Sequence, residues 1–360
     1  MTLAERTAPA RATGSAGASM EREIREQPAL WSVVVRDLGA IDEAARLIRA
    51  RDVRDVVLVG RGTSDNAARY AQYLLPLRAG VPAHLATPGL VTVYGASTHP
   101  RTSAVVAISQ SGRSPDLVAT VADARANGAP TIAVTNDPDS PLARQADVCV
   151  PIGVGPELAV AATKSYTGSL LALYLLTHRL AGADTAALRD CVEAMAPLGE
   201  AALEAAWPTA RRLAASLPEA DRGVVVGRGL SLSTATEAAL KLTETCAMSV
   251  SGWSAADVMH GPLAQVAGGT VAIALRGQLG GRPSVDAVVA TLLERGVNVW
   301  GTTPSAQPVD DDLWLPEGLD EELVPLVEIL PLQVLALEMA RVRGLDPDRP
   351  AGLSKVTMTA

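Results

Sequence analysis

Val56-Val57-Leu58-Val59-Gly60-Arg61-Gly62 is matched in the second half of the chain by Val224-Val225-Val226-Gly227-Arg228-Gly229. Each copy has an apolar, β-branched run, a glycine turn and then a segment with helical periodicity. A strand, a turn and a helix repeated in this way predict an internal duplication. The sequence therefore predicts two similar α/β domains.

Further apolar runs extend both copies. The first copy predicts strands at 84–85, 104–109, 131–135 and 148–151, and the second at 224–226, 271–275, 297–301 and 313–315. Helical segments separate these strands, which is the alternation of a doubly wound parallel sheet flanked by helices. The alanine-rich stretch from Leu180 to Pro218 is predicted to be helical and to bridge the halves.

Composition excludes several classes of function. The chain has 360 residues, 48% of them hydrophobic, so it can bury a large core. Its net charge of −8 gives no broad basic surface for nucleic acid or for an anionic membrane. The longest apolar stretch, Leu170 to Leu176, is too short to span a bilayer. We expect a cytoplasmic protein that binds neither nucleic acid nor membrane.

Cysteine and nucleotide motifs give no sign of a cofactor. Cys149, Cys191 and Cys246 lie far apart without metal-type spacing, which is typical of reduced, structural cysteines. The turn at Gly60 lacks the third glycine and the later acidic residue of a dinucleotide site. A Walker lysine motif and a His-Glu-x-x-His helix are also missing. We therefore expect no metal and no cofactor, and a small phosphorylated metabolite remains as the ligand.

A serine-rich loop is the candidate for binding that metabolite. Ser109-Gln110-Ser111-Gly112 follows an apolar strand and precedes the helix start Ser114-Pro115-Asp116. Free N–H groups and the positive end of the helix dipole meet at such a junction and favour a phosphate. An ordinary serine N-cap is the alternative. The second copy reads Ala274-Leu275-Arg276-Gly277-Gln278 at this position, and this asymmetry favours a phosphate site in the first domain alone.

Acid–base chemistry has two candidate sources in the second half. Glu237, Lys241 and Glu244 fall on one helix face, where the ammonium would stabilise ionised Glu244 and partial burial would raise the pKa of that carboxyl. The alternative is a solvated salt-bridge face. His260 lies in Met259-His260-Gly261-Pro262-Leu263, where the chain changes direction, and a structural histidine is the alternative there.

Together these stretches resemble the sugar isomerase (SIS) family, in particular the isomerase half of glutamine–fructose-6-phosphate aminotransferase and the class II glucosamine-6-phosphate deaminases. The similarity covers nearly everything from Met20 onward. Other matching stretches are Glu23-Ile24-Arg25-Glu26-Gln27-Pro28, Ala161-Ala162-Thr163-Lys164-Ser165-Tyr166 and Pro350-Ala351-Gly352-Leu353-Ser354-Lys355. Residues 1–19, rich in Ala, Gly, Ser, Thr and Arg, are predicted from their composition to form a loose tail. The resemblance implies SIS domains at 20–195 and 196–345, and a tail at 346–360 that closes over the active site.

The resemblance also implies roles for named residues. A phosphorylated amino sugar would be bound by Thr63, Ser64, Ser109, Gln110, Ser111, Ser114, Val160 and Ala162. Glu244 would move a proton between C1 and C2, and Lys241 would steady the developing charge. His260, donated across a homodimer, would help to open the sugar ring, and Lys355 would close over the substrate.

The reaction expected from the resemblance is deamination or isomerisation of glucosamine 6-phosphate without glutamine, since no glutaminase segment precedes Met20. Ser249 and Ser251 stand where relatives carry histidine and glutamate, and Leu232 stands where many have tyrosine. A less polar site could accept an N-acetyl group, so dehydration of N-acetylglucosamine 6-phosphate is the alternative. A non-catalytic phosphosugar sensor is a third possibility, although no DNA-binding segment accompanies the repeats.

Overall fold

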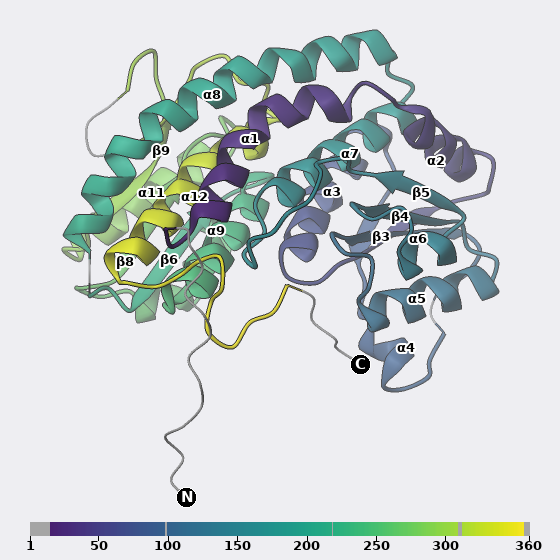
Figure 1. The fold of residues 1–360 in the computed structure, drawn as a ribbon, viewed down its shortest axis with the longest axis horizontal. Coiled ribbons are helices and arrows are strands. Elements are labelled where there is room, and N and C mark those ends of the chain that lie inside the picture. The colour runs from purple at the N-terminus through teal and green to yellow at the C-terminus, as the bar shows by residue number, and fades with distance from the viewer. Residues whose placement is uncertain (1–14, 98, 218, 309–311, 356–360) are drawn as a thin grey trace, which may run out of the picture.

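Two parallel sheets of five strands each form the framework of the chain (Figure 1). The computed structural model describes residues 15–97, 99–217, 219–308 and 312–355. The first sheet has the order β2-β1-β3-β4-β5, with β1 Asp55–Val59, β2 Ala83–Leu85, β3 Ser103–Ser109, β4 Thr131–Thr135 and β5 Val148–Pro151. The second has the order β10-β9-β8-β6-β7, with β6 Arg222–Gly227, β7 Ser249–Ser254, β8 Val271–Leu275, β9 Val299–Pro304 and β10 Leu313–Leu315. The predicted α/β class and the duplication are confirmed.

The two sheets are topological copies of each other. Taken from β7, the strand order of the second sheet is β7-β6-β8-β9-β10, which matches the order β2-β1-β3-β4-β5 of the first sheet strand for strand. The loop after β8 is thus the counterpart of the loop after β3. Strand β7 was not predicted from the sequence, because the segment contains three serines and a glycine and has no continuous apolar run. It lies at the edge of the sheet, where most of its residues are partly exposed.

Helices cover the sheets and join them. In the first half these are α1 Ala18–Val34, α2 Gly39–Arg49, α3 Thr63–Ala79, α4 Gly89–Thr92, α5 Pro115–Ala126, α6 Pro141–Gln145 and α7 Lys164–Leu180. The remainder are α8 Thr185–Ser216, α9 Ser231–Cys246, α10 Ala255–Val258, α11 Arg282–Glu294 and α12 Val324–Val342, with a 3₁₀ turn at Pro262–Gln265. Helix α8 runs along both halves in Figure 1. The predicted boundary at 195/196 falls inside this continuous helix, so α8 is a shared element.

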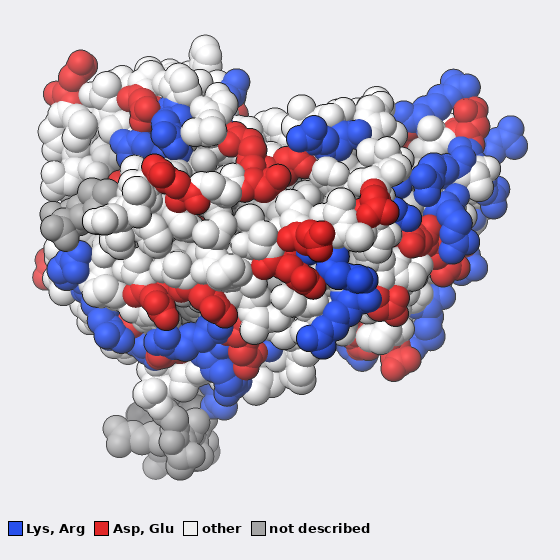
Figure 2. Space-filling view, turned by 90° about the horizontal axis from the view of Figure 1, so that it is seen from above, with Lys and Arg blue, Asp and Glu red and all other residues white. Residues whose placement is uncertain are grey.

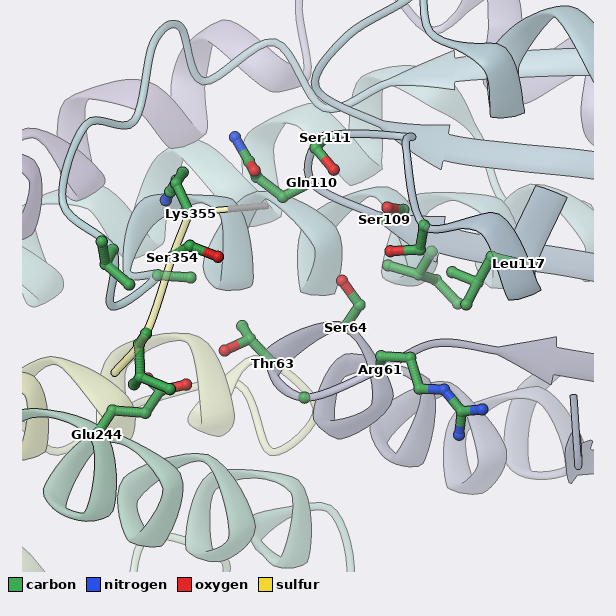
Figure 3. A pocket seen from close by; sticks show the side chains of 16 residues that line it. Arg61, Thr63, Ser64, Ser109, Gln110, Ser111, Leu117, Glu244, Ser354 and Lys355 are labelled. Atoms are coloured by element: carbon green, nitrogen blue, oxygen red, sulfur yellow. The ribbon is translucent and has the colours of Figure 1, made fainter. Parts of the chain in front are cut away.

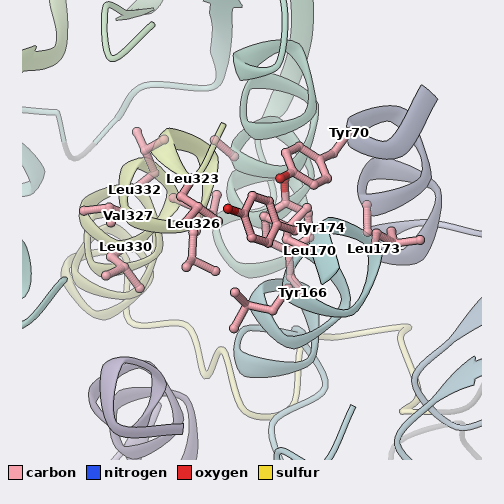
Figure 4. Packing of buried hydrophobic residues seen from close by; sticks show 14 of the residues in the cluster. Tyr70, Tyr166, Leu170, Leu173, Tyr174, Leu323, Leu326, Val327, Leu330 and Leu332 are labelled. Atoms are coloured by element: carbon pink, nitrogen blue, oxygen red, sulfur yellow. The ribbon is translucent and has the colours of Figure 1, made fainter. Parts of the chain in front are cut away.

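One hydrophobic core connects the two halves. Helices α7 and α12 are buried along nearly their whole length, and side chains from α3, α7 and α12 meet in Figure 4. Tyr70, Tyr166 and Leu326 are each at most 1% exposed, and the Tyr70 hydroxyl donates to the carbonyl of Glu322 at 3.0 Å. Full burial of side chains of this size stabilises a fold by about 1.5–3 kcal/mol each. The halves are therefore packed as one unit, and a site between them is preorganised.

The C-terminal tail is tied to the first helix. The carboxylate of Asp348 accepts hydrogen bonds from the N–H groups of Ser19 and Met20, both at 2.8 Å, and so caps α1. Asp346 likewise accepts from Gly17 at 3.1 Å. Residues 18 and 19 thus belong to α1 and not to the loose segment predicted at 1–19. Residues 1–14 and 356–360 of the two predicted tails lie outside the described residues.

Surface charge agrees with the acidic composition. Basic and acidic side chains are intermingled over the face shown in Figure 2, without a continuous basic surface on that face. No helix within the described ranges is long and apolar enough to cross a membrane.

Candidate phosphosugar site

The loop between β3 and α5, residues 109–114 and here called the phosphate loop, is shaped by a glycine and by its own hydroxyls. Gly112 has φ +61°, and a Cβ there would lie 2.1 Å from the Ser140 hydroxyl, so both backbone and space require glycine. The Ser109 hydroxyl accepts from the N–H of Gly112 at 3.1 Å. Ser114 is the N-cap of α5, with Pro115 at the first helical position. The strand, loop and helix predicted from the sequence are confirmed here.

A second turn faces this loop from β1. Gly62, with φ +55°, leads into α3, so that Thr63 and Ser64 occupy the first helical positions. The Thr63 hydroxyl donates to the carboxylate of Glu237 at 3.0 Å. Arg61 pairs with Asp116 at 2.7 Å and links this turn to the start of α5. Two helix N-termini therefore open beside one another, both rich in hydroxyls.

Helix α9 of the second half brings its charged groups to the same place. The Lys241 ammonium lies 2.7 Å from Glu244, 3.3 Å from Glu237 and 3.2 Å from the Thr63 hydroxyl. Asn66 donates to the other oxygen of Glu237 at 2.8 Å. The side chains of Lys241 and Glu237 are 1% and 0% exposed, while that of Glu244 is 23% exposed. This cluster is buried between α9 and α3, which is not the solvated face considered as the alternative.

Burial and pairing shift the pKa values of this cluster. Complete burial raises the pKa of Glu237 to about 7, because the attraction of Lys241 offsets the loss of hydration only in part. Burial alone would lower the pKa of Lys241, but the two neighbouring carboxylates outweigh it and raise that pKa. Lys241 is thus a cation held beside Glu244 at the edge of the cavity.

A cavity of about 340 Å³ joins these parts (Figure 3). This volume suits a small polar metabolite. Ten of the site residues predicted from the sequence line this cavity: Thr63, Ser64, Ser109, Gln110, Ser111, Ser114, Val160, Ala162, Glu244 and Lys355. Figure 3 shows Ser109, Gln110 and Ser111 along one side, Thr63 and Ser64 on the facing side, and Lys355 and Glu244 toward the same end. Lys241 contacts Glu244 from within the protein and does not itself line the cavity.

His260 is a second predicted site residue that does not line the cavity formed by the single chain. It is exposed and follows α10, where its N–H bonds to the carbonyl of Asp257 at 3.0 Å. Ser249, Ser251 and Leu232, whose identities motivated the dehydratase alternative, also do not line the cavity. These three substitutions leave the wall formed by one chain unchanged.

Comparison with known proteins identifies the family. The SIS domain model matches residues 50–179 and again 216–342. The chain belongs to the SIS family. It is 32% identical over 347 residues to a glutamine–fructose-6-phosphate aminotransferase of Pyrobaculum aerophilum, an alignment that covers 93% of this chain and 56% of that protein. The chain thus spans little more than half the length of the curated relatives that it matches.

Solved structures show the same SIS architecture. The C-terminal domain of glucosamine-fructose-6-phosphate aminotransferase from Francisella tularensis superposes with a TM-score of 0.82 at 25% identity, covering 94% of this chain and 100% of the other. A glucosamine-6-phosphate deaminase from Thermotoga maritima has a TM-score of 0.77 at 21% identity, covering 95% and 100%, which shows a shared fold.

The second SIS domain has the same loops, but its own carboxylates occupy them. Ser231, the counterpart of Ser64, donates to Glu328 at 2.6 Å, and the N–H of Gly277 donates to the same carboxylate at 3.0 Å. Glu321 accepts from the N–H groups of residues 279 and 280 at 3.1 and 3.3 Å. In the first SIS domain, no carboxylate of the described residues is hydrogen-bonded to the N–H groups of residues 111, 113 and 114, the counterparts of 277, 279 and 280. The loop N–H groups of the second domain are thus occupied by the chain's own carboxylates, whereas those of the first domain are not.

Two residues of the site, Asn66 and Glu157, were not predicted from the sequence. Asn66 orients Glu237, and an isolated asparagine on a helix carries no signal of such a contact. Glu157 is fully buried and bonded to Lys355, although it lies in a loop remote in sequence from the tail. Only the folding of distant segments against one another reveals either residue.

Proposed function

We propose that this SIS protein is an amino-sugar 6-phosphate deaminase/isomerase of the glucosamine-6-phosphate type. The observation that supports this best is the shared cavity, in which a phosphate loop from one domain faces a carboxylate paired with a buried ammonium from the other. A phosphate in the loop and a reacting carbonyl near Glu244 are the two requirements for proton transfer along an open-chain sugar phosphate.

In the proposed reaction, the phosphate is held by the hydroxyls of Ser64, Ser109 and Ser111 and by loop N–H groups. The ring opens to the C1 aldehyde, with His260 of a second copy assisting. Glu244 then removes the C2 proton and returns it to C1, while one amine proton passes to O1, and the aldose with a C2 amine becomes a C2 ketimine. Water adds to C2, and ammonia leaves to give the ketose phosphate. Lys241 lies 2.7 Å from the Glu244 carboxylate and orients it for the first step.

The test uses glucosamine 6-phosphate and N-acetylglucosamine 6-phosphate in separate incubations, with ammonia, ketose phosphate and mass followed over time. Ammonia and ketose phosphate from the first sugar are expected. A loss of 18 Da from the acetylated sugar alone would instead support dehydration. Turnover of neither sugar would refute the proposal.

Glu244→Gln separates catalysis from binding. The variant keeps the shape of the side chain but removes the base, so kcat should fall by about 10²–10⁴-fold while the dissociation constant of the sugar phosphate stays within a few-fold. Equal loss of binding would indicate that Glu244 holds the ligand and does not transfer a proton.

A further inference from the structure

The loop of residues 157–162, here called the cavity wall because it contributes Val160 and Ala162 to the cavity lining, is held in place by other segments. The carboxylate of Glu23, from α1, accepts hydrogen bonds from the N–H groups of Leu158 and Ala159. The N–H of Val160 donates to the carbonyl of Asp348 at 3.2 Å. The wall is therefore fixed by α1 on one side and by the base of the C-terminal tail on the other.

Glu157 begins this wall and is bound on both carboxylate oxygens. One oxygen accepts the N–H groups of Thr163 and Ser165 at 2.9 and 3.0 Å, so the carboxylate caps the start of α7. The other accepts the Ser165 hydroxyl at 2.7 Å and the Lys355 ammonium at 2.9 Å. With its side chain 0% exposed, Glu157 is a rigid acceptor.

Lys355 reaches Glu157 from the end of the described tail. Its ammonium also donates to the carbonyl of Ala159 at 2.7 Å, and its side chain is 25% exposed. In Figure 3 it lies with Ser354 at the end of the cavity where Glu244 is found. The fully buried carboxylate is thus neutralised by a cation that also faces the cavity.

We propose that Glu157 is the positioning residue of Lys355: it holds the ammonium at the cavity wall and thereby keeps the C-terminal tail closed beside Glu244. The catalytic consequence rests on the proposed function, while the closure of the tail does not. Capping of α7 needs only the oxygen that binds Thr163 and Ser165 N–H groups. The ion pair on the second oxygen is the additional feature that a purely structural role leaves unexplained.

Charge supports this assignment. Glu157, Glu237 and Glu244 surround the region, and the cations contacting them are Lys241 and Lys355. Lys355 is the basic side chain that pairs with Glu157 within the described ranges. A free tail would leave the buried Glu157 carboxylate without its counter-ion, which favours the closed position.

Limited trypsin digestion of the full chain tests the closure without an activity assay. Trypsin must take the Lys355 side chain into its own pocket to cut after it, whereas the bond after Arg349 is protected by Pro350. The rate at which residues 356–360 are released, measured by mass spectrometry, therefore reports how often the ion pair between Glu157 and Lys355 opens. Glu157→Gln should accelerate this release about 10-fold or more, because a charged hydrogen bond is lost.

Glu23→Gln is the matched control. It alters another buried carboxylate that holds the same wall, but it leaves the pair between Glu157 and Lys355 intact. Release should stay near the wild-type rate in this variant. If Glu157→Gln fails to fold, Glu157→Asp, which keeps the charge but shortens the reach, should also accelerate release. Equal rates in wild type and the Glu157 variants, or equal acceleration by Glu23→Gln, would overturn the proposal.

The catalytic part has a separate readout. On glucosamine 6-phosphate, Glu157→Gln should lower kcat about 10-fold or more and leave KM within about twofold, because the phosphate loop is untouched. A changed KM with an unchanged kcat would refute the positioning role. If the wild type turns over no amino-sugar phosphate, the proposed function fails, and the digestion result still decides whether Glu157 closes the tail.

Discussion

Replacing Lys241 by Met should destabilise the protein far more than an ordinary salt-bridge deletion. The ammonium contacts two carboxylates and a hydroxyl, and both Lys241 and Glu237 are inaccessible to solvent. Removal of one partner of a buried ion pair typically lowers the free energy of unfolding by about 3–5 kcal/mol, because the remaining charged side chain is buried with neither a counter-ion nor water. Met fills a similar volume, so the packing cost stays below about 1.5 kcal/mol.

Arg69→Met provides the matched control. Asp65 and Arg69 have the same i,i+4 spacing on α3 at 3.1 Å, but their side chains are 31% and 36% exposed. An exposed helical pair of this kind is worth about 0.3–0.5 kcal/mol. The two variants therefore compare one spacing at two depths of burial.

Thermal unfolding followed by circular dichroism measures the difference. We expect Tm to fall by about 4–7 °C for Lys241→Met and by no more than about 1 °C for Arg69→Met. The double variant Glu237→Gln, Lys241→Met removes both charges and should recover much of the loss. Similar small shifts in both single variants would refute the reasoning.

The pH dependence has a definite sign. Because the folded-state pKa of Glu237 is raised to about 7, protonation of Glu237 stabilises the fold below its ordinary pKa of 4.5, and this contribution is lost as pH rises through 7. A neutral Glu237 needs no counter-ion. The Tm gap between wild type and Lys241→Met should therefore be smaller at pH 5 than at pH 8.5, and a gap that widens on acidification would contradict this account.

Three further changes test other parts of the site. Gly112→Ala places a Cβ against Ser140 at a positive φ and should weaken binding of inorganic phosphate about 10-fold or more by calorimetry; unchanged binding would show that the loop tolerates a side chain. Mixing His260→Ala with Glu244→Gln should restore up to about a quarter of the activity if mixed dimers carry one intact site, and no recovery would remove His260 from a shared site. Asp348→Ala uncaps α1 and should cost about 1 kcal/mol, measured by hydrogen exchange of the Ser19 and Met20 amides, with unchanged exchange contradicting the cap.

Sequence periodicity was sufficient for the repeated framework because buried parallel strands are continuous apolar runs. Val56–Val59 and Val224–Val226 have this pattern, and both form interior strands with a neighbour on each side. Strand β7 does not, since an edge strand can keep small polar residues on its exposed side. The phosphate loop was predictable for a related reason: strand, loop and helix are adjacent in sequence, so their junction is a local feature.

The burial of the acid–base cluster was not predictable in the same way. The spacing of Glu237, Lys241 and Glu244 predicts a shared face, but it is equally compatible with a solvated salt bridge. Packing of α9 against α3 makes the difference, and Asn66 and Thr63 complete the cluster from the other half. Glu157 depends on a still longer contact, with Lys355 near the end of the chain.

The acidic side chains in the loops of the second SIS domain affect how the two halves compete for ligand. Glu321 and Glu328 are tethered to the chain, so their effective concentration at those N–H groups does not change with dilution, whereas that of a dissolved phosphate does. A phosphorylated metabolite would have to displace the carboxylates of Glu321 and Glu328, which remain attached beside these N–H groups. Raising the substrate concentration therefore does not readily fill the loops of the second SIS domain. Under the proposed function, saturation is expected at one sugar phosphate per chain, and the second copy contributes a scaffold and the pair of Glu244 with Lys241 instead of a second binding event.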